Sequence, residues 1–196
     1  MKNKVNGRFI VFIMVLCLVF IGLVIAGIVL FNNREPKVIN KNEHGAKILL
    51  NYTNDVSGLT LTKLNPTIDN VGMQDLTDGN YLDFSVEVKL DNATSVKYEI
   101  AAVKDSTNST VKDEDIRIYL EKENSGTYTK VFIPSKFEPL TKKSDLGSPK
   151  GSMVLVTTKK TNSKPDNYRL RMWVSDKATI QDGTYSIMLK VNGKAY

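Results

Sequence analysis

The stretch Leu82-Asp83-Phe84-Ser85-Val86-Glu87-Val88-Lys89-Leu90 alternates apolar and polar side chains without a break. Successive side chains of a β-strand point to opposite faces, so a period of two predicts a strand with one buried and one solvated face. An amphipathic helix would instead repeat its apolar positions every three or four residues. The stretch therefore indicates an antiparallel sheet packed on a core through one face.

Similar alternation recurs along the rest of the chain. It is clear at 96–102, 116–120, 168–174 and 185–191, and weaker at 47–53, 59–64, 128–133 and 153–158. With the first stretch this gives about nine strands, separated by turn signals such as Asp78-Gly79-Asn80. No segment has a sustained helical period, which disfavours parallel βαβ units. We therefore predict an all-β fold, an antiparallel two-sheet β-sandwich over residues 46–196, and both immunoglobulin-like and jelly-roll topologies fit the pattern.

Residues 9–31, FIVFIMVLCLVFIGLVIAGIVLF, contain no charged side chain, so they suit the interior of a lipid bilayer better than water. As a helix they would reach about 34 Å, enough to cross a hydrocarbon core of about 30 Å. We predict one N-terminal transmembrane helix, an anchor whose defining residues are Phe9, Phe20, Gly22, Ala26 and Phe31. Gly22 and Ala26 also have the spacing of a helix-pairing motif, although such pairs occur by chance in apolar segments. The alternative is a cleaved signal peptide, whose apolar region is usually shorter.

The charges that flank this helix predict its orientation. Lys2, Lys4 and Arg8 precede it, whereas Arg34 on the other side is followed by Glu35. The positive-inside rule then makes residues 1–8 a cytoplasmic tail of a single-pass protein in the cell membrane. Residues 32–45 are polar and aperiodic and read as a linker, which makes residues 46–196 an extracytoplasmic domain.

The composition excludes several classes of function. The net charge of +6 falls to +3 once Lys2, Lys4 and Arg8 are set aside, and no block of like charge remains that would indicate a nucleic-acid partner. The chain has one cysteine, Cys17, and one histidine, His44, so cysteine–histidine catalysis and multi-histidine zinc sites are not expected. We predict no enzyme, no catalytic residue, no metal and no cofactor.

Two acidic clusters could bind calcium, and three further residues could form a cross-link, but each observation also has a simpler explanation. The clusters offer oxygen ligands of the kind that calcium prefers, but they lack a full binding-loop spacing and suit tight turns equally well: Asp75, Asp78 and Asn80; Asp113, Glu114 and Asp115. Lys63, Asn192 and Glu99 could form and assist a lysine–asparagine isopeptide bond. Each of these three also stands at a polar position that needs no such explanation.

The best candidate for ligand binding is a stripe on the segment 167–176. Arg169, Arg171 and Trp173 occupy the face opposite Leu170 and Met172 and are expected to point outward. Aromatic rings and guanidinium groups suit glycans and anionic cell-wall polymers. The alternative is that carboxylates and rings of neighbouring strands cover these side chains, as often happens in sheets.

Four segments carry a resemblance to small exported proteins of AT-rich Gram-positive gut bacteria: Asn65–Asp69, Leu120–Asn124, Gly151–Leu155 and Tyr168–Trp173. No function comes with that resemblance. An N-terminal helix followed by an all-β domain is also similar to camelysin and the biofilm-matrix fibre proteins. This second resemblance implies only a place in the envelope or its matrix.

These observations favour a membrane-anchored, surface-displayed binding or structural module of a Gram-positive cell envelope. Its partners would be the membrane and a cell-wall polymer, a glycan or another surface protein. A self-assembling matrix or fibre subunit is the alternative, with oligomerisation through an unpaired edge strand. An exported hydrolase ranks third.

Overall fold

The computed structural model describes residues 37–41, 46–52, 57–180 and 182–196. The chain divides into one unit of residues 1–36 and a second of residues 37–196, which contains all the described residues. The predicted transmembrane helix at 9–31 lies outside the described residues. Neither of the two short helices that the structure describes is long and apolar enough to cross a membrane.

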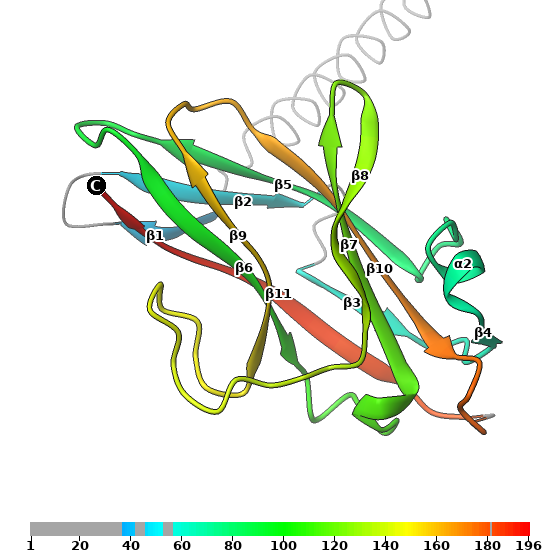
Figure 1. Ribbon diagram of the computed structural model, residues 1–196. Helices are drawn as coiled ribbons and strands as arrows, with labels where there is room; N and C mark the ends of the chain where they lie inside the picture. The colour runs from blue at the N-terminus through cyan, green and yellow to red at the C-terminus, as the bar shows by residue number, and fades with distance from the viewer. Residues whose placement is uncertain (1–36, 42–45, 53–56, 181) are drawn as a thin grey trace, which may run out of the picture. The chain divides into compact units, whose positions relative to one another are not determined.

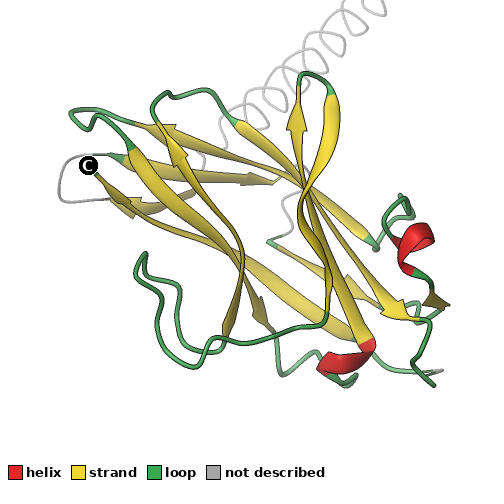
Figure 2. Ribbon diagram, in the orientation of Figure 1, coloured by secondary structure: helices red, strands yellow, loops and turns green. Residues whose placement is uncertain are grey.

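The second unit consists of two β-sheets (Figures 1 and 2). The larger sheet has the strand order β1-β2-β5-β10-β7-β8, with the two-residue β4 paired to β10, and the smaller sheet has the order β3-β11-β6-β9. All pairings are antiparallel except that of β4 with β10. The elements are β1 (Lys37–Lys41), β2 (Lys47–Tyr52), β3 (Gly58–Leu61), β4 (Pro66–Thr67), α2 (Asp69–Gly72), β5 (Tyr81–Lys89), β6 (Val96–Lys104), η1 (Asp113–Asp115), β7 (Ile116–Asn124), β8 (Thr127–Ser135), β9 (Ser152–Lys160), β10 (Asp166–Ser175) and β11 (Tyr185–Ala195).

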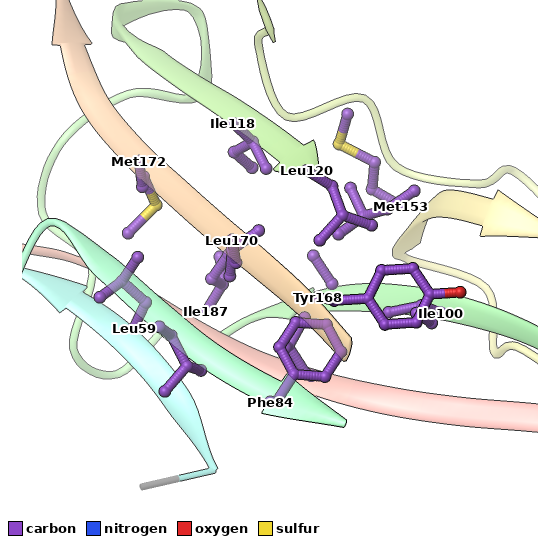
Figure 3. Close-up of a cluster of buried hydrophobic side chains, with 14 of the residues drawn as sticks. Leu59, Phe84, Ile100, Ile118, Leu120, Met153, Tyr168, Leu170, Met172 and Ile187 are labelled. Atoms are coloured by element: carbon purple, nitrogen blue, oxygen red, sulfur yellow. The ribbon is translucent and has the colours of Figure 1, made fainter. Parts of the chain in front are cut away.

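The core lies between the two sheets and contains the side chains that the alternation predicts (Figure 3). In β5 the inward residues Leu82, Phe84, Val86 and Val88 are at most 5% exposed, while the side chains between them are partly exposed. Phe84 stacks on Tyr168 of β10 with ring centroids 5.4 Å apart. The predicted two-sheet, mostly antiparallel β-sandwich is confirmed.

One end of the sandwich is joined by a polar cluster around Asp166. The Tyr98 hydroxyl, from the smaller sheet, donates to Asp166 of the larger sheet and is also 2.7 Å from the Tyr168 hydroxyl. Lys160 and Lys122 pair with Asp166 at 2.9 and 3.0 Å. Burial raises the pKa of Asp166, but these hydrogen bonds outweigh burial and leave the pKa below its usual value. The charged carboxylate therefore stabilises the contact between the sheets.

Part of the segment predicted as a linker, 32–45, is a strand in the structure. Residues 37–41 form β1, which pairs antiparallel with β2. Val38 and Ile39 are adjacent in the sequence KVINK, so no period of two marks this strand. The described residues contain eleven strands, two more than the nine predicted. The two additional strands are β1 and the two-residue β4, and neither has a recognisable alternating pattern.

Candidate functional site

The predicted stripe lies on the outer face of the larger sheet, where β10 runs between β5 and β7. Arg169 is opposite Asp83, and its Nε and Nη2 atoms donate to the two carboxylate oxygens at 2.6 and 2.7 Å. The guanidinium carbon is 4.3 Å from the ring centroid of Tyr128 and 5.4 Å from that of Tyr81. The two-pronged pair and the rings fix the guanidinium in one place. The hydrogen bonds with Asp83 raise the pKa of Arg169, so the guanidinium stays charged.

Arg171 is held more deeply than Arg169. Its Nη1 donates to the carboxylate of Glu121 on β7, and its Nε donates to the carbonyl oxygen of Asp75 at 2.9 Å. Only 7% of the Arg171 side chain and 12% of the Glu121 side chain are exposed. The hydrogen bond to Asp75 ties the loop that follows α2 to the sheet.

Trp173 is covered by the short helix α2, which contacts β10 (Figure 1). A Cβ atom added to Gly72 would overlap the indole ring, so glycine permits the close approach of the helix. The edge of Tyr119 also meets the indole, with ring centroids 6.4 Å apart. Trp173 is 3% exposed, and its indole N–H has no hydrogen-bond partner in the described structure.

Two of the three stripe residues are therefore covered, which is the alternative that the sequence leaves open. Arg171 and Trp173 point outward from the sheet, but the segment 69–80 covers them. Arg169 keeps some contact with solvent, since 18% of its side chain is exposed. Ligand binding by the stripe stays a hypothesis, and the geometry restricts it to the surroundings of Arg169.

Next to Arg169 the same face has a groove of about 320 Å³. It is lined by one carboxylate, two amides, one serine and four aromatic residues: Asp83; Asn51 and Asn167; Ser85; Tyr52, Phe84, Tyr128 and Tyr168. Tyr128 comes from β8 and is partly exposed. Burial is the main cause that raises the pKa of Tyr128, so its hydroxyl stays protonated at neutral pH. An aromatic ring surrounded by fixed hydrogen-bonding groups suits a polar, uncharged ligand such as a sugar.

Sequence reasoning did not identify Tyr128 as a site residue. The residue falls in a weak strand run, 128–133, and nothing near it in the sequence indicates a ligand. Its partners Arg169 and Asp83 come from β10 and β5, which only the strand pairing brings together.

In each acidic cluster one carboxylate is occupied by hydrogen bonds within the protein. One carboxylate oxygen of Asp75 accepts the backbone N–H of Thr77, and the other accepts the side-chain amide of Asn80, as in a tight turn. Asp113 accepts hydrogen bonds from Lys104 and from the Tyr185 hydroxyl. The described residues contain no group of three or more His, Cys, Asp or Glu side chains placed to hold a metal ion.

The residues considered for an isopeptide bond are partly brought together. Asn192 of β11 lies opposite Glu99 of β6, and both bond to the loop before β9. The Asn192 amide donates to the Ser148 hydroxyl, while Glu99 accepts the backbone N–H of Ser148 and the hydroxyl of Ser144. Glu99 is 4% exposed, although it stands at a polar position of the alternating pattern. Lys63 is exposed beyond the end of β3, and the structure, which describes all three residues, shows no bond between it and Glu99 or Asn192.

Comparisons with known proteins add little to this picture. No family model matches the sequence, and no curated protein matches it. Among solved structures, the chain is similar to the VP2 subviral particle of infectious bursal disease virus, with 12% identity and a TM-score of 0.33 over 76% of this chain and 33% of that one. It is also similar to a GDSL-like lipase from Bacteroides ovatus, with 11% identity and a TM-score of 0.21 over 76% of this chain and 43% of that one. The chain thus spans less than half the length of either protein.

Proposed function

We propose that this protein is a binding module displayed on the surface of a Gram-positive cell envelope, without catalysis, and that its ligand is a glycan of the cell wall. The groove beside Arg169 is the observation that carries the proposal. Its charged groups, Arg169 and Asp83, already neutralise each other, so a bound ligand need supply no charge. Tyr128 provides a ring on which a sugar can pack, and the Asn51 and Asn167 amides can bond its hydroxyl groups.

We further propose that the apolar segment at 9–31 anchors the module to the membrane with residues 1–8 in the cytoplasm. The support is the uncharged length of the segment and the lysines and arginine before it. The domain outside the membrane would then begin at Lys37, because β1 is part of the larger sheet. Membrane fractionation of full-length protein and of residues 37–196 tests the anchor, since only the longer chain should sediment with membranes.

For the sandwich we infer a jelly-roll topology. Four nested pairs support it: β3 with β11, β5 with β10, β6 with β9, and β7 with β8. A long antiparallel ribbon folded over on itself gives this nesting, and rolling the ribbon places alternate pairs in opposite sheets. The β1 and β2 strands then extend the sheet that contains β5.

Retention of residues 37–196 on purified cell-wall glycan tests the binding site. Replacing Tyr128 by alanine removes the ring and should lower the affinity about 2-fold to 10-fold, the usual contribution of an aromatic contact. Ile133→Ala is the matched control, because Ile133 stands on the same strand, is 65% exposed and does not line the groove. Equal retention of the Tyr128 variant and wild type would show that the groove does not bind the glycan.

A fibre or matrix subunit is the second candidate, and β8 is the observation that favours it. This nine-residue strand is at one edge of the larger sheet and pairs only with β7 among the described strands. Exposed Ile133 makes the edge attractive for strand addition, while Pro134 limits it by removing one backbone donor. A concentration series in size-exclusion chromatography separates the candidates, since a matrix subunit should self-associate and Ile133→Lys should prevent it.

A further inference from the structure

The outer face of the smaller sheet has a row of three lysines directly opposite one another. Lys194 of β11 is in register with Lys97 of β6, and Lys97 is in register with Lys159 of β9. All three side chains are exposed. Like charges at opposite positions destabilise a sheet, and none of the three lysines has an ion-pair partner among the described residues. The fold thus retains the repulsion between these three lysines on the smaller sheet.

Other lysines extend the positive charge of this row. Beyond Lys97, a groove of about 340 Å³ is lined in part by Lys142 and Lys143 from the loop before β9. Beyond Lys159, a second groove of about 320 Å³ is lined in part by Lys164. Both grooves border the row, because Lys97 lines the first and Lys159 the second. The result is a continuous basic track across the end of the sheet.

The carboxylates near this track offset only part of its charge. Glu99 and Asp145 line the first groove. Glu99 is buried and already accepts hydrogen bonds from Ser144 and Ser148, and Asp145 is one exposed charge on the loop. In the second groove Asp166 is neutralised by Lys160 and Lys122. The exposed ammonium groups of the row therefore stay available to an anion.

We propose that this lysine track binds a linear polymer that carries phosphate in its backbone and has no nucleobases. Lysine is a compact point charge that meets phosphate from many directions, so a row of lysines suits a repeating and flexible anion. Neighbouring strands are about 4.8 Å apart, so the row spans about 10 Å and can contact several successive phosphates. This site is separate from the Tyr128 groove, which lies on the other sheet, and goes beyond the proposed function.

The face favours a polymer without bases because it offers them no row of aromatic side chains on which to stack. Beside the lysine row, the other outward residues of the three strands are aliphatic, polar or charged: Met188, Lys190 and Asn192 on β11, Glu99, Ala101 and Val103 on β6, and Thr157 on β9. Proteins that bind single-stranded nucleic acid combine basic grooves with several aromatic side chains, whereas the only exposed ring that the described residues place beside the row is Tyr196, which follows β11. A flat sheet face also cannot enter the major groove of a duplex, which admits a helix or a two-stranded ribbon.

The test measures binding of full-length protein in detergent micelles to long-chain inorganic polyphosphate. The triple variant Lys97→Gln, Lys159→Gln, Lys194→Gln is compared with the control Lys112→Gln, Lys130→Gln, Lys177→Gln. The control has the same net charge, and its residues are exposed and lie on β8 or in loops outside the smaller sheet. We expect the row variant to lose affinity at least about tenfold and its salt dependence to weaken by about 0.7 per lost phosphate contact. The control should bind like wild type.

Several results would overturn the proposal. One is equal loss of affinity in both triple variants, which would mean that only net charge matters. Another is tighter binding of a single-stranded DNA of matched length or of anionic phosphatidylglycerol vesicles than of polyphosphate, which would assign the track to nucleic acid or to the membrane surface. A row variant that binds normally also refutes it. Since the variant should fold at least as stably as wild type, its unfolding midpoint separates lost binding from lost structure.

This outcome is independent of the proposed function. Retention of Tyr128→Ala on a neutral glycan and binding of the lysine variants to polyphosphate report on different sheets. Failure in one assay therefore leaves the other result in place.

Discussion

The outer faces of the two sheets treat their cations in opposite ways. On the larger sheet Arg169 and Arg171 each face a carboxylate, and α2 covers the end of the stripe. On the smaller sheet Lys97 faces two other lysines, and no carboxylate of the described residues forms an ion pair with any of the three. In the sequence alone both sets of cations look alike, since each cation stands on or close to a predicted strand. The neighbouring strands therefore decide whether an outward cation is structural or available to a ligand.

If the cations of the larger sheet are structural, Arg171→Ala should have the largest effect on stability. The change leaves Glu121 buried without its partner, and breaking such a pair costs about 3–5 kcal/mol. Arg169→Ala should cost only about 1 kcal/mol, because that pair is more exposed. Urea unfolding of residues 37–196 measures both variants. Equal losses would mean that depth of burial does not distinguish the two pairs.

The cover over the stripe can be disturbed through Gly72. Alanine there would push α2 away from Trp173, and such overpacking costs about 1–3 kcal/mol. For a domain of this size each kcal/mol lowers Tm by about 2–4 °C. Trp173 is the only tryptophan, so its emission should shift to the red as the indole gains water. Val71→Ala is the control, since Val71 is 55% exposed on the same helix. An unchanged Tm and emission spectrum in Gly72→Ala would argue against tight cover.

The smallest expected effect has the opposite sign. Lys97→Thr removes the central charge of the lysine row and should raise the free energy of unfolding by about 0.2–1 kcal/mol at low salt. The gain should shrink as salt screens the repulsion. Lys130→Thr is the contrast, because Lys130 lies opposite Glu121 and should give no gain. A loss of stability in Lys97→Thr would show that the row is compensated within the fold.

The fold class follows from local pattern, and the missed elements show where that pattern ends. Strands with one buried face, such as β5, must alternate, so their sequence reveals them. The short β1 has adjacent apolar residues and the two-residue β4 is too short to alternate, so neither carries the signal. Glu99 shows the same limit for side chains, because a loop 45 residues away in the sequence supplies its partner Ser144.

The candidate sites could be predicted only in part. The sequence identifies Arg169 as outward and basic, but its pairing with Asp83 and stacking on Tyr128 depend on strands 86 and 41 residues away in the sequence. The lysine row was hidden for the same reason, since Lys97, Lys159 and Lys194 stand in three separate segments. Spread along the chain among Asp and Glu residues, they give no block of like charge.

Local sequence is enough to specify that the described domain is made of strands with one apolar face, because the period of side-chain direction is a local property of the backbone. It also specifies the inward side chains of the regular strands, whereas core residues in loops, such as Val111, Phe137 and Ala178, carry no such signal. The tertiary structure alone decided which outward side chains meet, because strand order and register join segments that the chain keeps far apart. That register made the arginine stripe of the larger sheet part of the framework and aligned the lysines of the smaller sheet.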